Sequence, residues 1–400
     1  MALTPVAEAM AMILGAAKLL PPENVKLEQA HGRILFKPIV AKRDQPPFDS
    51  SAMDGYAVRA QDASLGATLK LAGTSAAGHA FNGTLKEGQA VRILTGAPMP
   101  KGADAIVIQE NVTRGSDTVL VNVSAVAARH IRKRGLDFKS RHILVPAGTR
   151  LNARDIALGA AAGVSIVSVR KKPRVAIITT GDELVAPGMK PRSDQIYSSN
   201  AFALQAMAQN WGADVNNFGI IKDTLKATTS AIAKAIKTSD LLVTTGGASV
   251  GDQDFVQQAL KDNGFKMGFW KIAMRPGKPL MFGTKGKVIA LGLPGNPVAA
   301  MVCARLFVHT LLATMSGRTV EQPEATAALE VDLPANDERQ DYVRATVTYL
   351  PDGRRTTKPA AIQDSSMQRT LRDAQALIIR PPLAPPAKVG DLVPLLLLDF

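Results

Sequence analysis

Three segments between residues 174 and 315 share one pattern, and it restricts the fold more than any other feature of the chain. Each is an apolar strand that ends in a glycine turn and continues into a helical pattern: RVAIITTGDEL (174–184), DLLVTTGGASVGDQDF (240–255) and KVIALGLPGNPVAAMVCARLF (287–307). Helical patterns at 200–212 and 229–237 lie between them. This alternation predicts a doubly wound, mostly parallel sheet. Such sheets bind ligands beyond the carboxyl ends of their strands, where all three glycine turns are expected.

The rest of the chain predicts a multidomain α/β plus β protein. Short alternating strands divided by glycines indicate a small all-β domain at 46–139, and short strands with an Asp352-Gly353 hairpin signal indicate a β-barrel or sandwich at 323–400. Residues 1–45 and 140–173 form a further domain. It opens with a helix after Thr4-Pro5, and a second helix is expected to begin near Asn152. The sheet domain then spans 174–322.

Composition excludes several classes of protein. Of the 400 residues, 46% are hydrophobic and 20% are charged, which is typical of a globular chain. The net charge of +14 comes with only 4% aromatic residues, so there is no base-stacking platform and nucleic-acid binding is not expected as the main role. The single Cys303 excludes a disulfide framework, and the five histidines show no metal-ligand spacing. No stretch was expected to cross a membrane, which predicts a cytoplasmic protein.

Carboxylates follow the predicted strand ends. Glu183 follows the first glycine turn, Asp252 follows the Gly246-Gly247 turn, and Asp223 ends another expected strand. A single acid in such a place is most simply a helix cap. Several acids at one sheet edge, beside backbone N–H groups that bind anions, indicate instead a Mg²⁺ ion that bridges to a phosphate.

Cations and rigid turns accompany these acids. In the segment MRPGKP, Pro276-Gly277 separates Arg275 from Lys278 and Pro279 follows, so the prolines stiffen a loop that carries two cations; the alternative is an exposed basic turn. Pro294 and Pro297 frame a Pro-Gly-Asn-Pro turn that is either a rigid connector or part of a pocket. In the N-terminal half, Asp54 and Thr95 lie in loop segments, and Asp137 lies in a basic cluster where a structural salt bridge is the alternative.

Six motifs in order resemble the molybdopterin molybdenumtransferase family, which includes MoeA and the carboxy-terminal domain of gephyrin. They are PPFDSSAMDGYAV, RILTGAPMPKGADAIV, TTGDELV, TTGGASVGDQD, MRPGKP and LPGNPV, and the similarity runs from about residue 5 to 400. The resemblance implies an elongated first domain, a β domain, a molybdopterin-binding sheet domain and a terminal β-barrel. It also implies a homodimer with its active site at the subunit interface.

The activity implied by the resemblance is insertion of molybdate into adenylylated molybdopterin, with Mg²⁺-dependent release of AMP. The implied catalytic residues are Asp54, Thr95, Asp137, Glu183, Asp223 and Asp252, the last three also as metal ligands. The implied substrate-binding residues are Gly246, Gly247, Ser249, Arg275, Lys278, Pro294, Pro297, Arg344 and Thr370. Molybdopterin adenylyltransferase and molybdoenzyme chaperones are implied as protein partners.

The chain departs from the family pattern at four positions, and three alternatives stay open. Arg275 stands where lysine is usual, Ala299 and Thr370 stand where serine is usual, and Gln375 stands where asparagine is usual. The alternatives are a non-catalytic molybdopterin-binding scaffold, a paralogue acting on a related nucleotide-linked pterin, and an anion- or RNA-binding protein.

Overall fold

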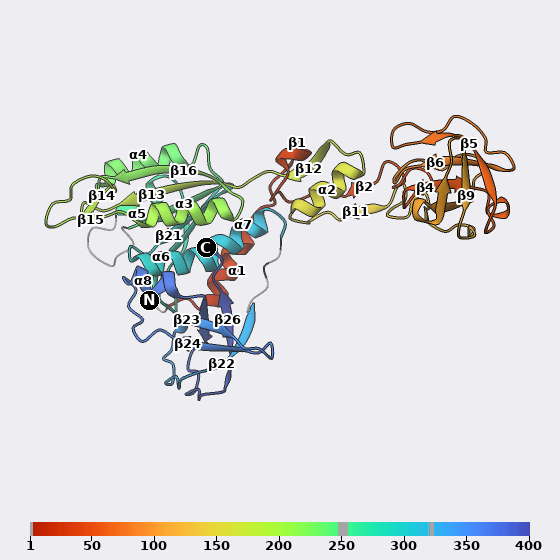
Figure 1. The fold of residues 1–400 in the computed structure, drawn as a ribbon. Helices are drawn as coiled ribbons and strands as arrows, with labels where there is room; N and C mark the ends of the chain where they lie inside the picture. Colours follow the sequence, from red (N-terminus) through yellow and green to blue (C-terminus); the bar gives the residue numbers. More distant parts are fainter. Residues whose placement is uncertain (1–2, 247–254, 319, 321–323) are drawn as a thin grey trace. The chain divides into compact units, whose positions relative to one another are not determined.

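The computed structural model describes residues 3–246, 255–318, 320 and 324–400 (Figure 1). The chain divides into two compact units, one of residues 24–169 and one of residues 1–23 with 170–400. The N-terminal helix α1 (Val6–Ala16) belongs to the second unit, where it packs against α7 (His309–Met315). The four domain boundaries expected from the sequence stay a prediction.

The second unit contains the predicted sheet, in the strand order β16-β13-β17-β21-β20-β18. The first four strands are parallel, and β20 and β18 are antiparallel additions at one edge. The strands are β13 (Arg174–Thr180), β16 (Asp214–Ile221), β17 (Leu241–Thr245), β18 (Lys266–Lys271), β20 (Pro279–Lys285) and β21 (Val288–Leu293). The prediction of a mostly parallel sheet is therefore confirmed.

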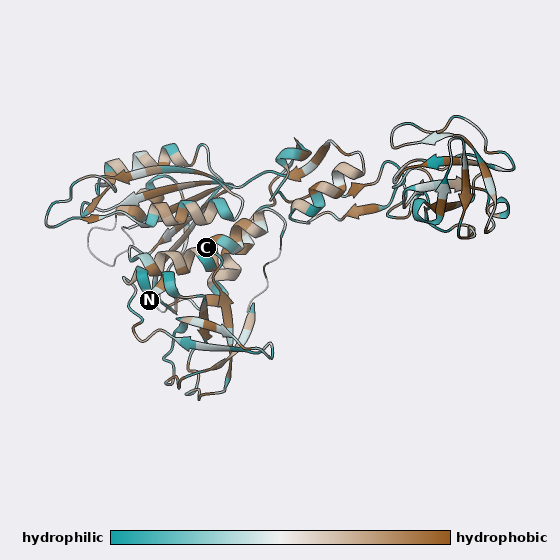
Figure 2. Cartoon of the chain, in the orientation of Figure 1, coloured by the Kyte–Doolittle hydropathy of each residue, from teal (hydrophilic) through white to brown (hydrophobic). Residues whose placement is uncertain are grey.

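Helices cover both faces of this sheet. One face packs against α1, α3 (Asn200–Asn210), α6 (Pro297–Cys303) and α7, and the other against α4 (Leu225–Ala235) and α5 (Phe255–Asp262). Burial on both sides explains why the central strands are almost continuously apolar. Figure 2 shows this as brown ribbon along the strands of the sheet.

Helices α6 and α7 join through a π-helical turn, Ala304–Val308, into one long apolar helix. Among the described residues, this stretch from Pro297 to Met315 is the one helix long and apolar enough to cross a bilayer, contrary to the sequence expectation. However, 89% of its most apolar window is buried in the protein, as befits a core helix. Its buried Arg305 pairs with Glu324 and Asp399 and so ties the helix to the terminal domain.

The terminal domain is a small closed barrel. Its strands pair in the ring β23-β24-β22-β26-β25 and back to β23, and β19 (Met274–Arg275) adds to β23. The strands are β22 (Ala325–Leu329), β23 (Gln340–Tyr349), β24 (Arg355–Pro359), β25 (Ala376–Arg380) and β26 (Leu392–Leu397). The predicted Asp352-Gly353 hairpin connects β23 to β24. Helix α8 (Gln368–Asp373) precedes β25.

The first unit contains the predicted all-β domain, a six-stranded sheet in the order β7-β4-β6-β5-β9-β8. Its strands are β4 (Gly55–Val58), β5 (Thr68–Ser75), β6 (Gln89–Ile93), β7 (Ala105–Ile108), β8 (Val112–Arg114) and β9 (Thr118–Val121). The short pairs β1 (Pro22–Lys26) with β12 (Ile166–Arg170), β2 (Ile39–Val40) with β11 (Ile143–Val145), and β3 (Ser50–Ser51) with β10 (Ile131–Arg132) complete the strands around it.

Two local expectations in this unit had different outcomes. Helix α2 (Ala153–Ala161) begins as predicted, because Asn152 caps it and Asp155 returns a hydrogen bond to the Asn152 backbone. The segment RILFKPIVAKRDQPPFD (33–49) predicts a strand that leads into a proline-rich crossing, but in place of that strand the structure has β2 and isolated bridges at Ile34 and Leu35. Pro38 lies between those bridges and β2, and it has no N–H for a continuous ladder.

The three glycine turns meet at the carboxyl edge of the parallel sheet. Gly246 follows β17 with φ +86°, and a Cβ built there would overlap the carbonyl oxygen of Thr180 at the end of β13. A Cβ built on Gly295, after β21, would lie 3.8 Å from the Gly246 Cα. The turns thus touch one another, and only glycine fits the middle one.

We expect Gly246→Ala to unfold this edge of the sheet. A positive φ alone costs about 1–2 kcal/mol for a residue with a Cβ, and overlap with the Thr180 carbonyl adds about 1–3 kcal/mol. Gly212→Ala is the matched control, because Gly212 has φ +94° but open space around it. Chemical denaturation should show a clearly larger loss for Gly246→Ala. Equal losses in the two variants would show that the close approach is unimportant.

Candidate functional site

A pocket of about 410 Å³ opens at this carboxyl edge. Its wall contains Thr180 from β13, Thr245 and Gly246 after β17, and Gly295 and Pro297 from the turn before α6. Glu183 also lines it. The sequence therefore located the pocket correctly from the strand ends alone.

Asn200, at the start of α3, joins two walls of the pocket. Its side-chain amide donates to Thr245 Oγ1 at 2.9 Å and to the Gly295 carbonyl at 2.7 Å. Thr245 Oγ1 in turn donates to the carbonyl of Pro294 at 3.3 Å. The hydroxyls of Thr179 and Thr180 are buried and have no partner within the described residues. Buried hydroxyls without partners are groups that a polar ligand can satisfy.

A segment of the barrel domain completes the pocket. Ser366 and Gln368 line it, and Gln368 donates to Ser199 Oγ at 3.0 Å. Asn296 donates to Ser365 Oγ at 2.7 Å. The sheet and barrel thus share one wall, although the partners lie 169 and 69 residues apart in the sequence.

The carboxylates gather beside the pocket. Asp223 Oδ1 is buried without a hydrogen-bond donor within the described residues, and the Asp223 N–H donates to Asp182 Oδ1 at 3.3 Å. Burial, with repulsion from Asp182 and Glu183, raises the pKa of the Asp223 carboxyl above its ordinary value. The Glu183 carboxylate folds over Gly181, where a Cβ would meet its oxygens at 2.6–2.8 Å. Sequence reasoning found Glu183 and Asp223 but missed Asp182, their immediate neighbour.

This arrangement fits a divalent cation held partly by the substrate. Within the described residues, no three His, Cys, Asp or Glu side chains form a complete metal-binding group. Mg²⁺ commonly takes one or two carboxylates and completes its shell with water and phosphate oxygens. A buried carboxylate oxygen that lacks a donor and faces like charges is suited to that role.

We expect Asp223→Asn to stabilise the chain at neutral pH in metal-free buffer. A carboxyl with a raised folded pKa binds its proton more tightly when folded, so it destabilises the fold above that pKa. The variant should therefore melt about 2 °C higher at pH 7, and the difference should vanish as the pH falls toward 3.8, the ordinary pKa of this group.

Asp352→Asn is the control for thermal melting, since the pKa of Asp352 is lowered by hydrogen bonds from Arg354. It should not melt higher. If Asp223→Asn melts no higher than wild type at pH 7, the ionised Asp223 carboxylate does not destabilise the fold.

The two cations of the MRPGKP segment, Arg275 and Lys278, differ in their surroundings. Arg275 donates two hydrogen bonds to Asp341 Oδ2, at 2.7 and 3.1 Å, and pairs with Asp337. It therefore joins the loop to the barrel, and its guanidinium is already neutralised. Lys278 is exposed, and its ammonium has no partner in the described part of the chain. Of the two, Lys278 is better placed to receive an oxyanion.

Arg344, on β23, is the most unusual cation in the chain. Its side chain is 0% exposed, and none of its three guanidinium nitrogens has a hydrogen-bond acceptor among the described residues. Burial lowers the pKa of the guanidinium, while attraction to Asp341 and Asp364 opposes the change. Asp364 also accepts two hydrogen bonds from Ser366, which lines the pocket. A buried unpaired cation is costly unless an anion complements it.

In the other unit, Asp54 and Thr95 lie together, a contact that the sequence did not predict. Asp54 Oδ1 accepts hydrogen bonds from the Thr95 backbone N–H and hydroxyl, both at 2.7 Å. These bonds hold the pKa of the Asp54 carboxyl below its ordinary value, so it stays ionised. Asp137 is exposed and has no ion-pair partner in the described residues, because Lys133 and Arg134 pair with Asp49 and Asp44. The structural salt bridge that was the alternative role for Asp137 is therefore not seen among the described residues.

The remaining predicted residues have varied outcomes. Gly247, Ser249 and Asp252 lie outside the described residues. Thr370 lies in α8 and does not line the pocket. Asn200 and Gln368 were missed, since their only signal is contact with segments distant in sequence.

Comparison with known proteins gives a consistent result. Residues 4–163 match the MoeA N-terminal region, 176–314 a probable molybdopterin-binding domain, and 326–398 the MoeA C-terminal region. A molybdopterin molybdenumtransferase from Nostoc is 38% identical over 83% of this chain and 78% of its own length. One from Haemophilus influenzae is 34% identical over 86% of each. The chain belongs to the molybdopterin molybdenumtransferase family.

Solved structures agree with this assignment. A molybdopterin biosynthesis MoeA protein from Pyrococcus horikosii has a TM-score of 0.84 and 29% identity, over 99% of both chains. The fold class predicted from the motifs is therefore confirmed, and so is the resemblance to a family of transferases that act in molybdenum cofactor biosynthesis.

Proposed function

We propose that this protein inserts molybdate into adenylylated molybdopterin and releases AMP. The observation that carries this proposal is the combination of the sheet-edge pocket, with Glu183 in its wall, and Arg344, which is buried without an acceptor among the described residues. The pocket supplies hydroxyls and backbone N–H groups for phosphates. Arg344 and Lys278 supply positive charge for an oxyanion. The relatives named as molybdopterin molybdenumtransferases support the same reaction.

In this proposal the residues position groups and supply charge more than they form bonds. Thr179 and Thr180, whose hydroxyls have no partner within the described residues, contact the substrate phosphates, and Asn200 holds the pocket walls at their spacing. Glu183 and Asp223, with Asp252, would hold Mg²⁺, which would supply positive charge for the substrate phosphates. Water attacks the phosphoanhydride, so that AMP leaves and the terminal phosphate stays on molybdopterin. Arg344 and Lys278 orient molybdate toward the dithiolene sulfurs, which bind molybdenum while an oxo group leaves as water with the two thiol protons. Asp54, kept ionised by Thr95, and Asp137 complete the proposed catalytic set.

The oligomeric state, the cellular location and the protein partners are proposals too. Family resemblance supports a cytoplasmic homodimer whose active site lies at the subunit interface. It also supports molybdopterin adenylyltransferase and molybdoenzyme chaperones as protein partners. Arg275 is proposed to act mainly by fixing the loop that bears Lys278, because its own guanidinium pairs with Asp341 and Asp337.

The direct test is molybdate-dependent AMP release from adenylylated molybdopterin with Mg²⁺. Asp54→Ala and Glu183→Ala should each lower turnover at least 100-fold, which corresponds to about 2.7 kcal/mol of lost transition-state stabilisation, with unchanged melting. Asp352→Ala, in the β23–β24 hairpin, should keep full activity. If the wild-type protein binds adenylylated molybdopterin tightly but does not turn it over, the alternative of a non-catalytic molybdopterin-binding scaffold would be supported instead.

Arg344→Met tests the oxyanion site separately. Removing a buried unpaired charge should leave melting unchanged or raise it, while the KM for molybdate should rise at least tenfold. Binding of adenylylated molybdopterin, measured by calorimetry without molybdate, should stay within twofold of wild type. A molybdate KM equal to that of wild type would remove Arg344 from the site.

A further inference from the structure

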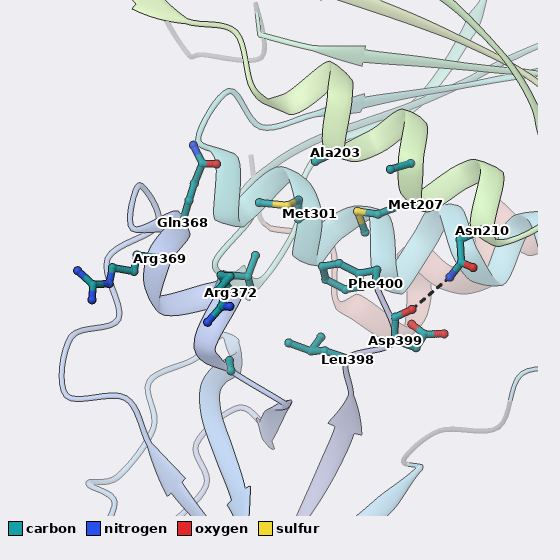
Figure 3. A pocket seen from close by; sticks show the side chains of 13 residues that line it. Ala203, Met207, Asn210, Met301, Gln368, Arg369, Arg372, Leu398, Asp399 and Phe400 are labelled. Atoms are coloured by element: carbon teal, nitrogen blue, oxygen red, sulfur yellow. Dashed lines mark hydrogen bonds between the residues drawn. The ribbon is translucent and has the colours of Figure 1, made fainter. Parts of the chain in front are cut away.

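The protein has a second cavity that is larger than the sheet-edge pocket. A separate cavity of about 750 Å³ lies between α3, α6, α8 and the last residues of the chain (Figure 3). Met207 and Met301 form part of its wall, together with Leu371, Leu398 and Phe400. Its volume falls within the range of about 300–1,000 Å³ typical of small-molecule sites. None of the roles proposed above uses it.

The shape of the cavity comes from small side chains on one face of α3. Ala203 and Ala206 lie three residues apart, and Met207 and Asn210 continue the same face. The alanines leave space that larger residues would fill. Across from them, Met301 of α6 and the ring of Phe400 offer an apolar surface, and methionine adapts to varied apolar groups. An aromatic or aliphatic body of moderate size would fit.

The two ends of the cavity differ in charge. Figure 3 shows Arg369 and Arg372 toward one end and Asn210 with Asp399 toward the other. Asp399 is already paired, since its carboxylate lies 3.0 Å from Arg305 Nε. Within the part of the chain that the structure describes, Arg372 pairs only with its sequence neighbour Asp373, and both side chains are exposed, so this pair is weak. The cavity therefore has a positive end and a neutralised end.

We propose that this cavity binds a small amphipathic anion, with its apolar body against Met207, Met301 and Phe400 and its anionic group at Arg372. The apolar wall supplies most of the affinity, and the arginine selects for the charge. The cavity and the sheet-edge pocket share Gln368 but have otherwise separate linings, so the anion occupies a space different from that proposed for the transferase substrate.

Two fluorescent probes test the proposal on the full chain: 8-anilinonaphthalene-1-sulfonate and its uncharged analogue N-phenyl-1-naphthylamine. We expect the sulfonate to bind once per chain and at least tenfold more tightly than the uncharged probe. Its addition should shift the methyl resonances of Met207 and Met301. Equal affinities for the two probes, or no saturable binding, would overturn the proposal.

Variants then locate the site. Ala206→Trp should abolish binding of both probes, because Ala206 is exposed on α3 and its replacement fills the cavity. Arg372→Gln should weaken the sulfonate at least tenfold and leave the uncharged probe unchanged. Arg354→Gln is the matched control, since Arg354 is likewise exposed and paired with a nearby aspartate. If Ala206→Trp fails to fold, Arg372→Gln alone decides. Unchanged affinity of Arg372→Gln for the sulfonate would show that Arg372 does not bind the anionic group, which would overturn the proposal.

Discussion

The contact between the ends of β13 and β17 is the constraint on which the candidate site depends. Gly246 lies against the Thr180 carbonyl, and Gly295 lies against Gly246, so three parallel strands end in one small space. Because parallel strands present their carboxyl ends at one edge, acids and hydroxyls that follow them are brought together. A larger residue at Gly246 would separate the turns and with them the walls of the pocket.

Around this edge, the structure maintains unfavourable electrostatics. Asp223 is partly buried beside Asp182 and Glu183, and Arg344 is fully buried without an acceptor among the described residues. Each arrangement costs folding free energy in isolation. Their opposite charges suit opposite ligands, a cation at the acids and an oxyanion at the arginine. Such local costs are expected where a protein binds and reacts rather than where it only folds.

The barrel contributes to the site through side chains distant in the sequence. Gln368 reaches Ser199, and Ser365 accepts from Asn296. The barrel also binds a cation of the sheet domain, since Asp341 and Asp337 form ion pairs with the guanidinium of Arg275. An arginine forms such a two-bond contact where a lysine would present a single point charge. The departure from the family pattern at this position is thus linked to a structural role.

The sequence by itself determined the fold class and the place of the pocket, because strand periodicity, glycine turns and proline-rich loops are local signals. It also located Glu183 and Asp223 at the sheet edge, but the pairing of Asp54 with Thr95 came from the structure. Only the tertiary structure decided which charges are paired: Arg275 pairs with Asp341, whereas Arg344 has no acceptor among the described residues. It also placed Asn200 between two walls of the pocket. The second cavity was likewise invisible in the sequence. Burial and partner choice arise from contacts between segments far apart along the chain, and no local pattern encodes them.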